Sequence, residues 1–167
     1  MTLPQWIIVA LALMRAGELV HAGRNARRLL ALGGHSVGDG HYPFIIALHA
    51  SWLFTLWWIG RRLTQPDWLL FGLFVLLEAA RLWVVATLGR FWTTRIITLP
   101  GAPLVRKGPY KWARHPNYLI VALEIPLLLY AFDAPGLAVL FGAANILLLA
   151  YRIRVEEDAL RARRLAS

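Results

Sequence analysis

Long apolar runs, broken by short polar segments, follow one another along most of the chain. A helix needs about 20 mostly apolar residues to cross the hydrocarbon core of a bilayer, or about 17 at the short end. Five stretches reach or approach this length. The pattern therefore predicts an all-α polytopic membrane protein with about five transmembrane helices in one domain, residues 1–167. The predicted spans are residues 3–21, 43–60, 68–88, 118–132 and 135–151.

The fourth predicted span is the least regular of the five. It is short, and it contains Glu124 and Pro126. Only Asp133 and Ala134 separate it from the fifth span. So short a connection predicts that the last two spans form a tight helical hairpin.

Composition supports a membrane protein and removes several other classes. The chain is 59% hydrophobic, whereas soluble domains are usually about 45–50% apolar. The chain has no Cys, which excludes disulfides, thiolate metal sites and Cys nucleophiles. Its formal charge is +9, and in so apolar a chain anionic lipid headgroups are a better partner than nucleic acid. The start, MTLPQWII, lacks the basic region and cleavage site of a signal peptide.

Basic residues are distributed unevenly between the two predicted faces of the membrane. Five spans place residues 22–42, 89–117 and those after Tyr151 on one side, and these segments hold fourteen Lys and Arg residues. The segment on the other side, residues 61–67, holds two. Because cytoplasmic loops are enriched in Lys and Arg, we predict an inner-membrane protein with its N-terminus outside and its C-terminus in the cytoplasm.

The segment 89–117 is too long for a simple connection. Loops of this length in compact proteins are usually functional. Its four prolines forbid a continuous helix, and Gly101 and Gly108 provide tight turns. We expect an ordered cytoplasmic loop that binds a ligand, on the same face as the acidic and basic tail.

The end of this loop, GPYKWARHPNY, is the first candidate for chemistry. A turn at Gly108 and Pro109 can point backbone N–H groups at a ligand. If Asn117 caps the next helix, Arg114 and His115 lie near a helix N-terminus, which suits a carboxylate ligand. The same residues fit equally well a basic loop that lies on the membrane surface.

Two adjacent carboxylates after the last span, Glu156 and Glu157, are the second candidate. In a strongly basic tail they could bind a ribose diol or an amino group. If the helix continues, however, Arg152 and Glu156 are four residues apart and could form an ordinary surface pair.

Ionisable residues within the predicted spans are the third candidate. Each costs about 2.5 kcal/mol or more at the membrane centre when unpaired. Arg15 with Glu18, and Glu78 with Arg81, could each pair within one helix, which would make these residues structural. Glu124 has no partner on its own helix and is therefore the better site candidate. These residues are Arg15, Glu18, His49, Glu78, Arg81 and Glu124.

The spacings of the His residues match no zinc motif, so we predict no metal site. No glycine motif for nucleotide binding occurs between a predicted strand and a helix.

The sequence KGPYKWARHPNY, followed by an apolar hairpin and RIRVEE, resembles the isoprenylcysteine carboxyl methyltransferase family of integral membrane enzymes. The segments GELVHAGRNARRL and RLWVVATLGRFWTTRIITLPGAPLV resemble a bacterial branch, with members thought to methylate alkylpyrone-type lipids. The resemblance runs from about Glu18 to Leu160. It implies S-adenosylmethionine as cofactor, with S-adenosylhomocysteine as product, in a cytoplasmic pocket between the long loop and the C-terminal helix.

Residue roles follow from this resemblance by matching position. Arg152 would orient an acidic acceptor, and Arg81 and Trp92 would contact the substrate. On chemical grounds, a hydroxyl acceptor would benefit from a base, and Glu124, Glu78 and His41 are the candidates for it. The candidate catalytic residues are therefore Arg152, Glu124 and Arg81. The implied cofactor-binding residues are Lys107, Gly108, Pro109, Tyr110, Arg114, His115, Asn117, Tyr118, Glu156 and Glu157.

Several points stay open at the level of sequence. The tail EEDALRARRLAS lacks the longer segment that the family usually carries, so we expect a shorter lid over the cofactor or closure by residues 22–42. The expected acceptor is a lipophilic small molecule or lipid that is methylated on a carboxylate or hydroxyl; the alternative is a phospholipid amine. A membrane reductase and a non-catalytic bundle are the alternatives outside this class. The first helix could pack within the chain or against a second copy.

Overall fold

The computed structural model describes residues 1–165, and side chains through Arg161. Arg163 and Arg164, counted above in the basic tail, are outside the described side chains. The described chain is predominantly helical, with four helices long and apolar enough to cross a membrane and a fifth, shorter apolar helix. The all-α prediction is therefore confirmed. The five helices are α1 (Leu3–Ala31), α2 (Tyr42–Gly60), α3 (Trp68–Leu88), α4 (Pro116–Ala131) and α5 (Pro135–Leu165).

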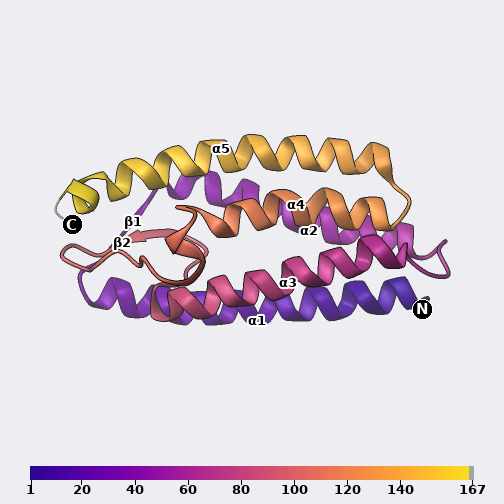
Figure 1. Ribbon diagram of the computed structural model, residues 1–167, viewed down its shortest axis with the longest axis horizontal. Helices are drawn as coiled ribbons and strands as arrows, with labels where there is room; N and C mark the ends of the chain where they lie inside the picture. The colour runs from indigo at the N-terminus through magenta and orange to yellow at the C-terminus, as the bar shows by residue number, and fades with distance from the viewer. Residues whose placement is uncertain (166–167) are drawn as a thin grey trace.

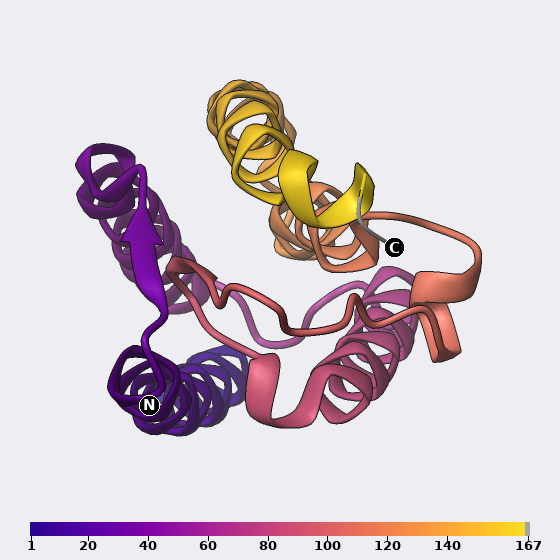
Figure 2. The same ribbon diagram turned by 90° about the vertical axis from the view of Figure 1, so that its left-hand side faces the viewer.

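The helices run side by side along the long axis of the molecule (Figure 1). Helix α2 packs against α1 and α5, and α4 packs against α3 and α5. Residues 89–115 cross one end of this bundle, as Figure 2 shows from that side. We call it the loop end.

Local sequence explains where these helices begin. Thr2 and Gln5 form a capping box at the start of α1, with Thr2 accepting a hydrogen bond from the Gln5 backbone N–H. Asp67 accepts from the backbone N–H groups of Leu69 and Leu70 at the start of α3. The prediction that Asn117 caps α4 is wrong. The residue before this helix is His115, and Pro116 occupies the first turn, where its missing N–H costs nothing.

Helices α1 and α5 continue well past the predicted spans at the loop end. Residues 22–31 extend α1, where we expected a loop, because Asn25 donates hydrogen bonds to the carbonyls of Gly89 (3.0 Å) and Trp92 (2.9 Å). The tail after Tyr151 extends α5 in the same way. The two tail glutamates, Glu156 and Glu157, are therefore on a helix that began inside the bundle.

Helix α4 is short but central. Its 16 residues rise about 24 Å, less than the roughly 30 Å hydrocarbon core. It buries Ile125, Leu128 and Leu129 against its neighbours. Two buried side chains also bind its backbone carbonyls: Trp52 donates to Ile125 (3.1 Å) and Asn145 to Val121 (3.1 Å). These contacts fix α4 between α2, α3 and α5.

The long loop is ordered by short elements rather than by a helix. Strand β2 (Ile96–Thr98) pairs antiparallel with β1 (His35–Val37), which follows α1. Three 3-10 turns complete the loop end: η1 (Asp39–His41), η2 (Gly89–Phe91) and η3 (Gly108–Lys111). The strand pair joins the segment after α1 to the long loop, so residues 22–42 take part in closing this end of the bundle.

Gly108 should tolerate no side chain. Its φ is +54°, and a Cβ there would lie 2.7 Å from Oγ1 of Thr87 on α3. Gly101 has a similar φ of +73°, but a Cβ there would meet nothing within 4 Å. We expect Gly101→Ala to cost about 1–2 kcal/mol from backbone strain and Gly108→Ala about 1–3 kcal/mol more from overpacking. The free energy of unfolding in detergent measures both, and equal costs would show that the contact with Thr87 is unimportant.

Candidate functional site

A cavity of about 990 Å³ opens inside the loop end of the bundle. This volume is at the upper end of the roughly 300–1,000 Å³ of small-molecule sites. All five helices and the loop contribute to its wall. Toward the middle of the bundle the wall is mostly apolar, with Ile45, Ile46, Leu53, Leu148 and Leu149. The cavity therefore joins a polar end, described next, to a mostly apolar interior that also exposes Arg15, Glu18 and Arg81.

Three predicted residues form a hydrogen-bonded chain at the polar end. Arg152 Nε donates to the hydroxyl of Tyr118 at 2.7 Å, and that hydroxyl donates to Glu156. Arg152 also donates to the carbonyl of Thr94 in the loop, at 2.6 Å. The expected direct surface pair between Arg152 and Glu156 is replaced by this link through Tyr118. Arg152 is buried and lines the cavity with Tyr118 and Glu156, so it is no ordinary surface arginine.

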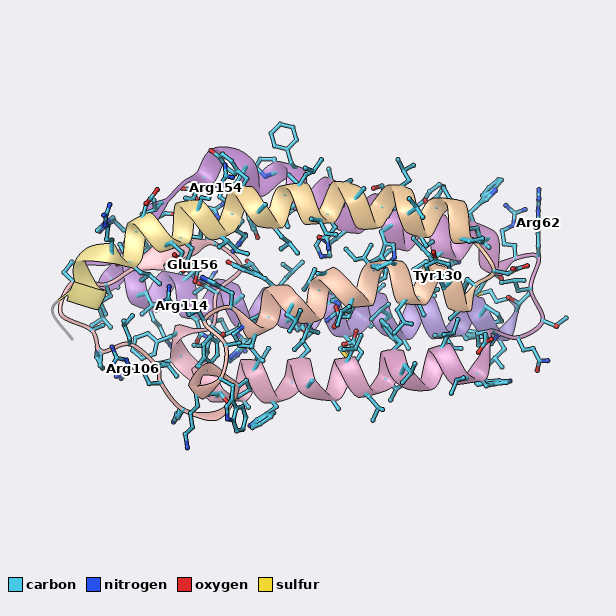
Figure 3. The ribbon with its side chains drawn as sticks, turned by 45° about the horizontal axis from the view of Figure 1, so that its top comes forward. Arg62, Arg106, Arg114, Tyr130, Arg154 and Glu156 are labelled. Carbon is cyan, nitrogen blue, oxygen red and sulfur yellow. The ribbon has the colours of Figure 1, made fainter. Side chains whose placement is uncertain are left out.

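His115 joins the long loop to the acidic pair of α5. Its Nε2 lies 3.2 Å from Glu157, its Nδ1 lies 3.8 Å from Glu156, and its ring stacks on Tyr118. Arg114 also approaches Glu157, at 3.6 Å. Figure 3 shows Arg114 and Glu156 at the loop end. Residues some forty positions apart in sequence are thus brought into one cluster.

Tyr110 stands at the edge of this cluster and lines the cavity. Burial, and then the negative charge of Glu156, raise the pKa of Tyr110 above its usual range. The phenol therefore stays neutral at physiological pH and can act as a hydrogen-bond donor.

Deeper in the bundle, five ionisable residues from three helices form a buried cluster. Arg81 binds Glu18 with both Nε (3.1 Å) and Nη2 (2.9 Å). Arg15 binds Glu18 (3.1 Å), Glu78 and Glu124 (3.1 Å). Arg81 also lies 3.7 Å from Glu124. Pairing across helices offsets much of the cost of placing charges at membrane depth.

This arrangement differs in part from the predicted pairing. The pair of Arg15 with Glu18 within α1 is confirmed, but Glu78 pairs with Arg15 instead of Arg81. Glu124 is bound by two guanidiniums from other helices, and its side chain is 3% exposed. The sequence shows spacing along one helix and not proximity between helices, so these partners could not be found from spacing alone.

The cavity wall includes some predicted site residues and leaves out others. Within the described side chains, Arg81, Tyr110, Arg114, His115, Asn117, Tyr118, Arg152 and Glu156 line it. The wall does not include Glu124, Lys107, Gly108, Pro109 or Glu157, and roles for these five residues stay predictions. Gly108 instead packs closely against α3.

Other wall residues were missed by sequence reasoning. Tyr42, Thr94 and Asn145 line the cavity, and Asn145 is almost fully buried. A lone amide in the apolar run LFGAANILLLA was a usable signal for Asn145, because polar residues within spans are costly and often functional. Thr94 had no such signal.

The described chain has apolar helices long enough to span a membrane and a large cavity with a charged end. These features define the class: an α-helical integral membrane protein with an internal cavity. Residues 68–162 match the model of the isoprenylcysteine carboxyl methyltransferase (ICMT) family. The chain belongs to this family.

Two relatives extend the similarity beyond the matched segment. The protein named uncharacterized protein YpbQ of Bacillus subtilis (strain 168) is 34% identical, over 93% of this chain and 96% of its own. A protein of Haemophilus influenzae, also named as uncharacterized, is 27% identical over 82% of this chain and 83% of its own. No solved structure matches the chain significantly. Family membership supports a membrane methyltransferase-like function.

Proposed function

We propose that this protein transfers a methyl group from S-adenosylmethionine to a carboxylate or hydroxyl oxygen of a lipophilic acceptor. The observation that carries the proposal is one continuous cavity, which joins the cluster of His115, Tyr118, Arg152 and Glu156 to a mostly apolar interior. A water-soluble cofactor and a lipid acceptor could meet there. The volume of about 990 Å³ accommodates both.

The residues at the polar end fit the chemistry of this cofactor. S-adenosylmethionine carries an ammonium and a ribose diol, for which Glu156 is a suitable acceptor, and a carboxylate, for which Arg114 and His115 are suitable donors. Tyr110 adds a neutral aromatic wall. When bound, the cofactor supplies an electrophilic methyl group on a sulfonium.

The chain contributes mainly position and environment. Holding two reactants in line can contribute about 7–11 kcal/mol to a bimolecular reaction. Arg152, held by Tyr118 and Thr94, presents a fixed cation to an acidic acceptor at the polar end. A carboxylate acceptor is already ionised at neutral pH and needs no base. A hydroxyl acceptor must lose a proton. Glu18 lines the cavity and Glu124 does not, but Arg15 and Arg81 both bind Glu18, which weakens it as a base.

An alkylpyrone-type acceptor is one form of this proposal, since it combines an acidic enol with an apolar tail. A phospholipid amine fits less well because Arg15, Arg81 and Arg152 all line the cavity. In a non-catalytic bundle, no ligand would explain why the long loop is bound to the carboxylates of α5.

Calorimetry with S-adenosylhomocysteine on detergent-purified protein tests the cofactor. We expect binding by the wild type and about tenfold weaker binding by His115→Ala and by Glu156→Gln, because each loses about one charge-assisted hydrogen bond. Arg62→Gln, at the opposite end of the bundle (Figure 3), is the control and should bind as the wild type does. No binding by a folded, monodisperse wild type would refute the proposal and favour a nicotinamide cofactor or a non-enzymatic bundle.

A further inference from the structure

The buried ionic cluster contains more negative than positive groups. Arg15 and Arg81 provide two guanidiniums, and Glu18, Glu78 and Glu124 provide three carboxyls. If all five were charged, the cluster would carry a net charge of −1 at membrane depth. An uncompensated charge there costs several kcal/mol, and buried groups usually change protonation instead.

Two oxygen atoms identify where the cluster is incomplete. Oε2 of Glu78 and Oε1 of Glu124 are buried and have no hydrogen-bond partner among the described residues. The other oxygen of each carboxyl contacts the same nitrogen, Nη2 of Arg15. Two carboxyls that meet at one nitrogen are close enough to interact strongly, and like charges at such range disfavour double ionisation.

The cavity does not offer a ligand cation as the missing positive charge. Arg15, Glu18 and Arg81 face the cavity, whereas Glu78 and Glu124 are not among its lining residues. Both unpartnered oxygens are buried from solvent, so a hydrated metal ion cannot reach them. From α2, His49 interacts electrostatically with Arg15 and Arg81, but its Nδ1 binds the carbonyl of Ile45, at 2.8 Å.

We propose that Glu78 and Glu124 together bind one proton at neutral pH, which makes the cluster electrically neutral. The proton removes the excess charge, and a neutral carboxyl costs less than a carboxylate when one of its buried oxygens has no hydrogen-bond partner. Neutrality lets Arg15, Glu18 and Arg81 stay ionised at fixed positions on the cavity wall. This inference does not depend on the methyl-transfer proposal.

Infrared difference spectroscopy in H₂O and D₂O detects a protonated carboxyl directly. We expect the wild type in lipid nanodiscs at neutral pH to show the carbonyl band of a protonated carboxyl, shifted by deuterium and by ¹³C-glutamate labelling. Glu78→Gln and Glu124→Gln should each lose the band, because two carboxylates then balance two guanidiniums. Each amide also replaces the acid isosterically, so both variants should fold.

Control variants separate this site from other protonated groups. Glu156→Gln and His49→Gln should keep the band, as should Asp133→Asn in the α4–α5 turn, where φ of +53° suits Asn. A folded wild type without a glutamate-derived band would overturn the proposal, and this outcome needs no variant. A band that persists in both cluster variants, or that disappears in Glu156→Gln or His49→Gln, would assign the proton elsewhere and equally overturn it.

Discussion

Replacing Arg15 by Met should lower the free energy of unfolding by about 3–5 kcal/mol, the usual cost of removing one partner from a buried ionic network. Arg15 contacts Glu18, Glu78 and Glu124 on three helices. Without it, three carboxyls face the single guanidinium of Arg81. To remove the excess negative charge, two of the carboxyls must be protonated, or the carboxyls must become partly exposed to water. Either change costs free energy.

Unfolding in mixed micelles, followed by circular dichroism, measures this cost. Arg24→Met and Arg27→Met are matched controls, because both side chains are exposed on the same helix. We expect these variants to stay within about 0.5 kcal/mol of the wild type. A loss for Arg15→Met no larger than theirs would mean that the cluster contributes nothing to holding α1 against α3 and α4.

The sequence predicted the helical core of this fold well because spanning length has a strong compositional signal. The prediction for α3, residues 68–88, matches the observed bounds. The sequence did not predict where α1 and α5 end. The hydrophobic pattern follows apolar runs, and the ends of both helices are more polar. There, Asn25 and the tail carboxylates make tertiary contacts that stabilise the extended helices. The pairing of β1 with β2 is non-local and involves three residues on each strand, too few for a periodic signal.

For the candidate site, residue types were predictable and their partners were not. The motif around His115 and the acidic pair at Glu156 were identified from sequence, and the structure brings them together. The link from Arg152 through Tyr118 to Glu156 depends on how α4 and α5 pack. No spacing along the chain encodes this packing. Orientation in the membrane stays a prediction based on the charge bias.

Arg152→Met should reduce kcat/KM for methyl transfer by about 100-fold, if the proposed function is correct. Arg152 is 7% exposed and holds both Tyr118 and the loop carbonyl of Thr94. Its loss removes hydrogen bonds from a charged donor, each contributing about 1.5–3 kcal/mol, and about 2.7 kcal/mol corresponds to 100-fold in rate. Because Tyr118 still reaches Glu156, cofactor affinity should change much less than kcat/KM.

Labelled-methyl transfer to membrane lipid extracts, together with calorimetry of S-adenosylhomocysteine binding, separates these two effects. Arg154→Met is the matched control: it removes an exposed arginine two residues further along α5 and should leave both quantities near wild-type values. Arg152→Lys keeps the charge but lacks the planar group that reaches Tyr118 and Thr94 together, so it should recover only part of the rate. Full recovery by Lys would mean that charge alone orients the acceptor. An Arg152→Met variant that is folded, binds cofactor and keeps its rate would remove Arg152 from the reaction, and the acceptor would then have to be oriented by Arg81, deeper in the same cavity.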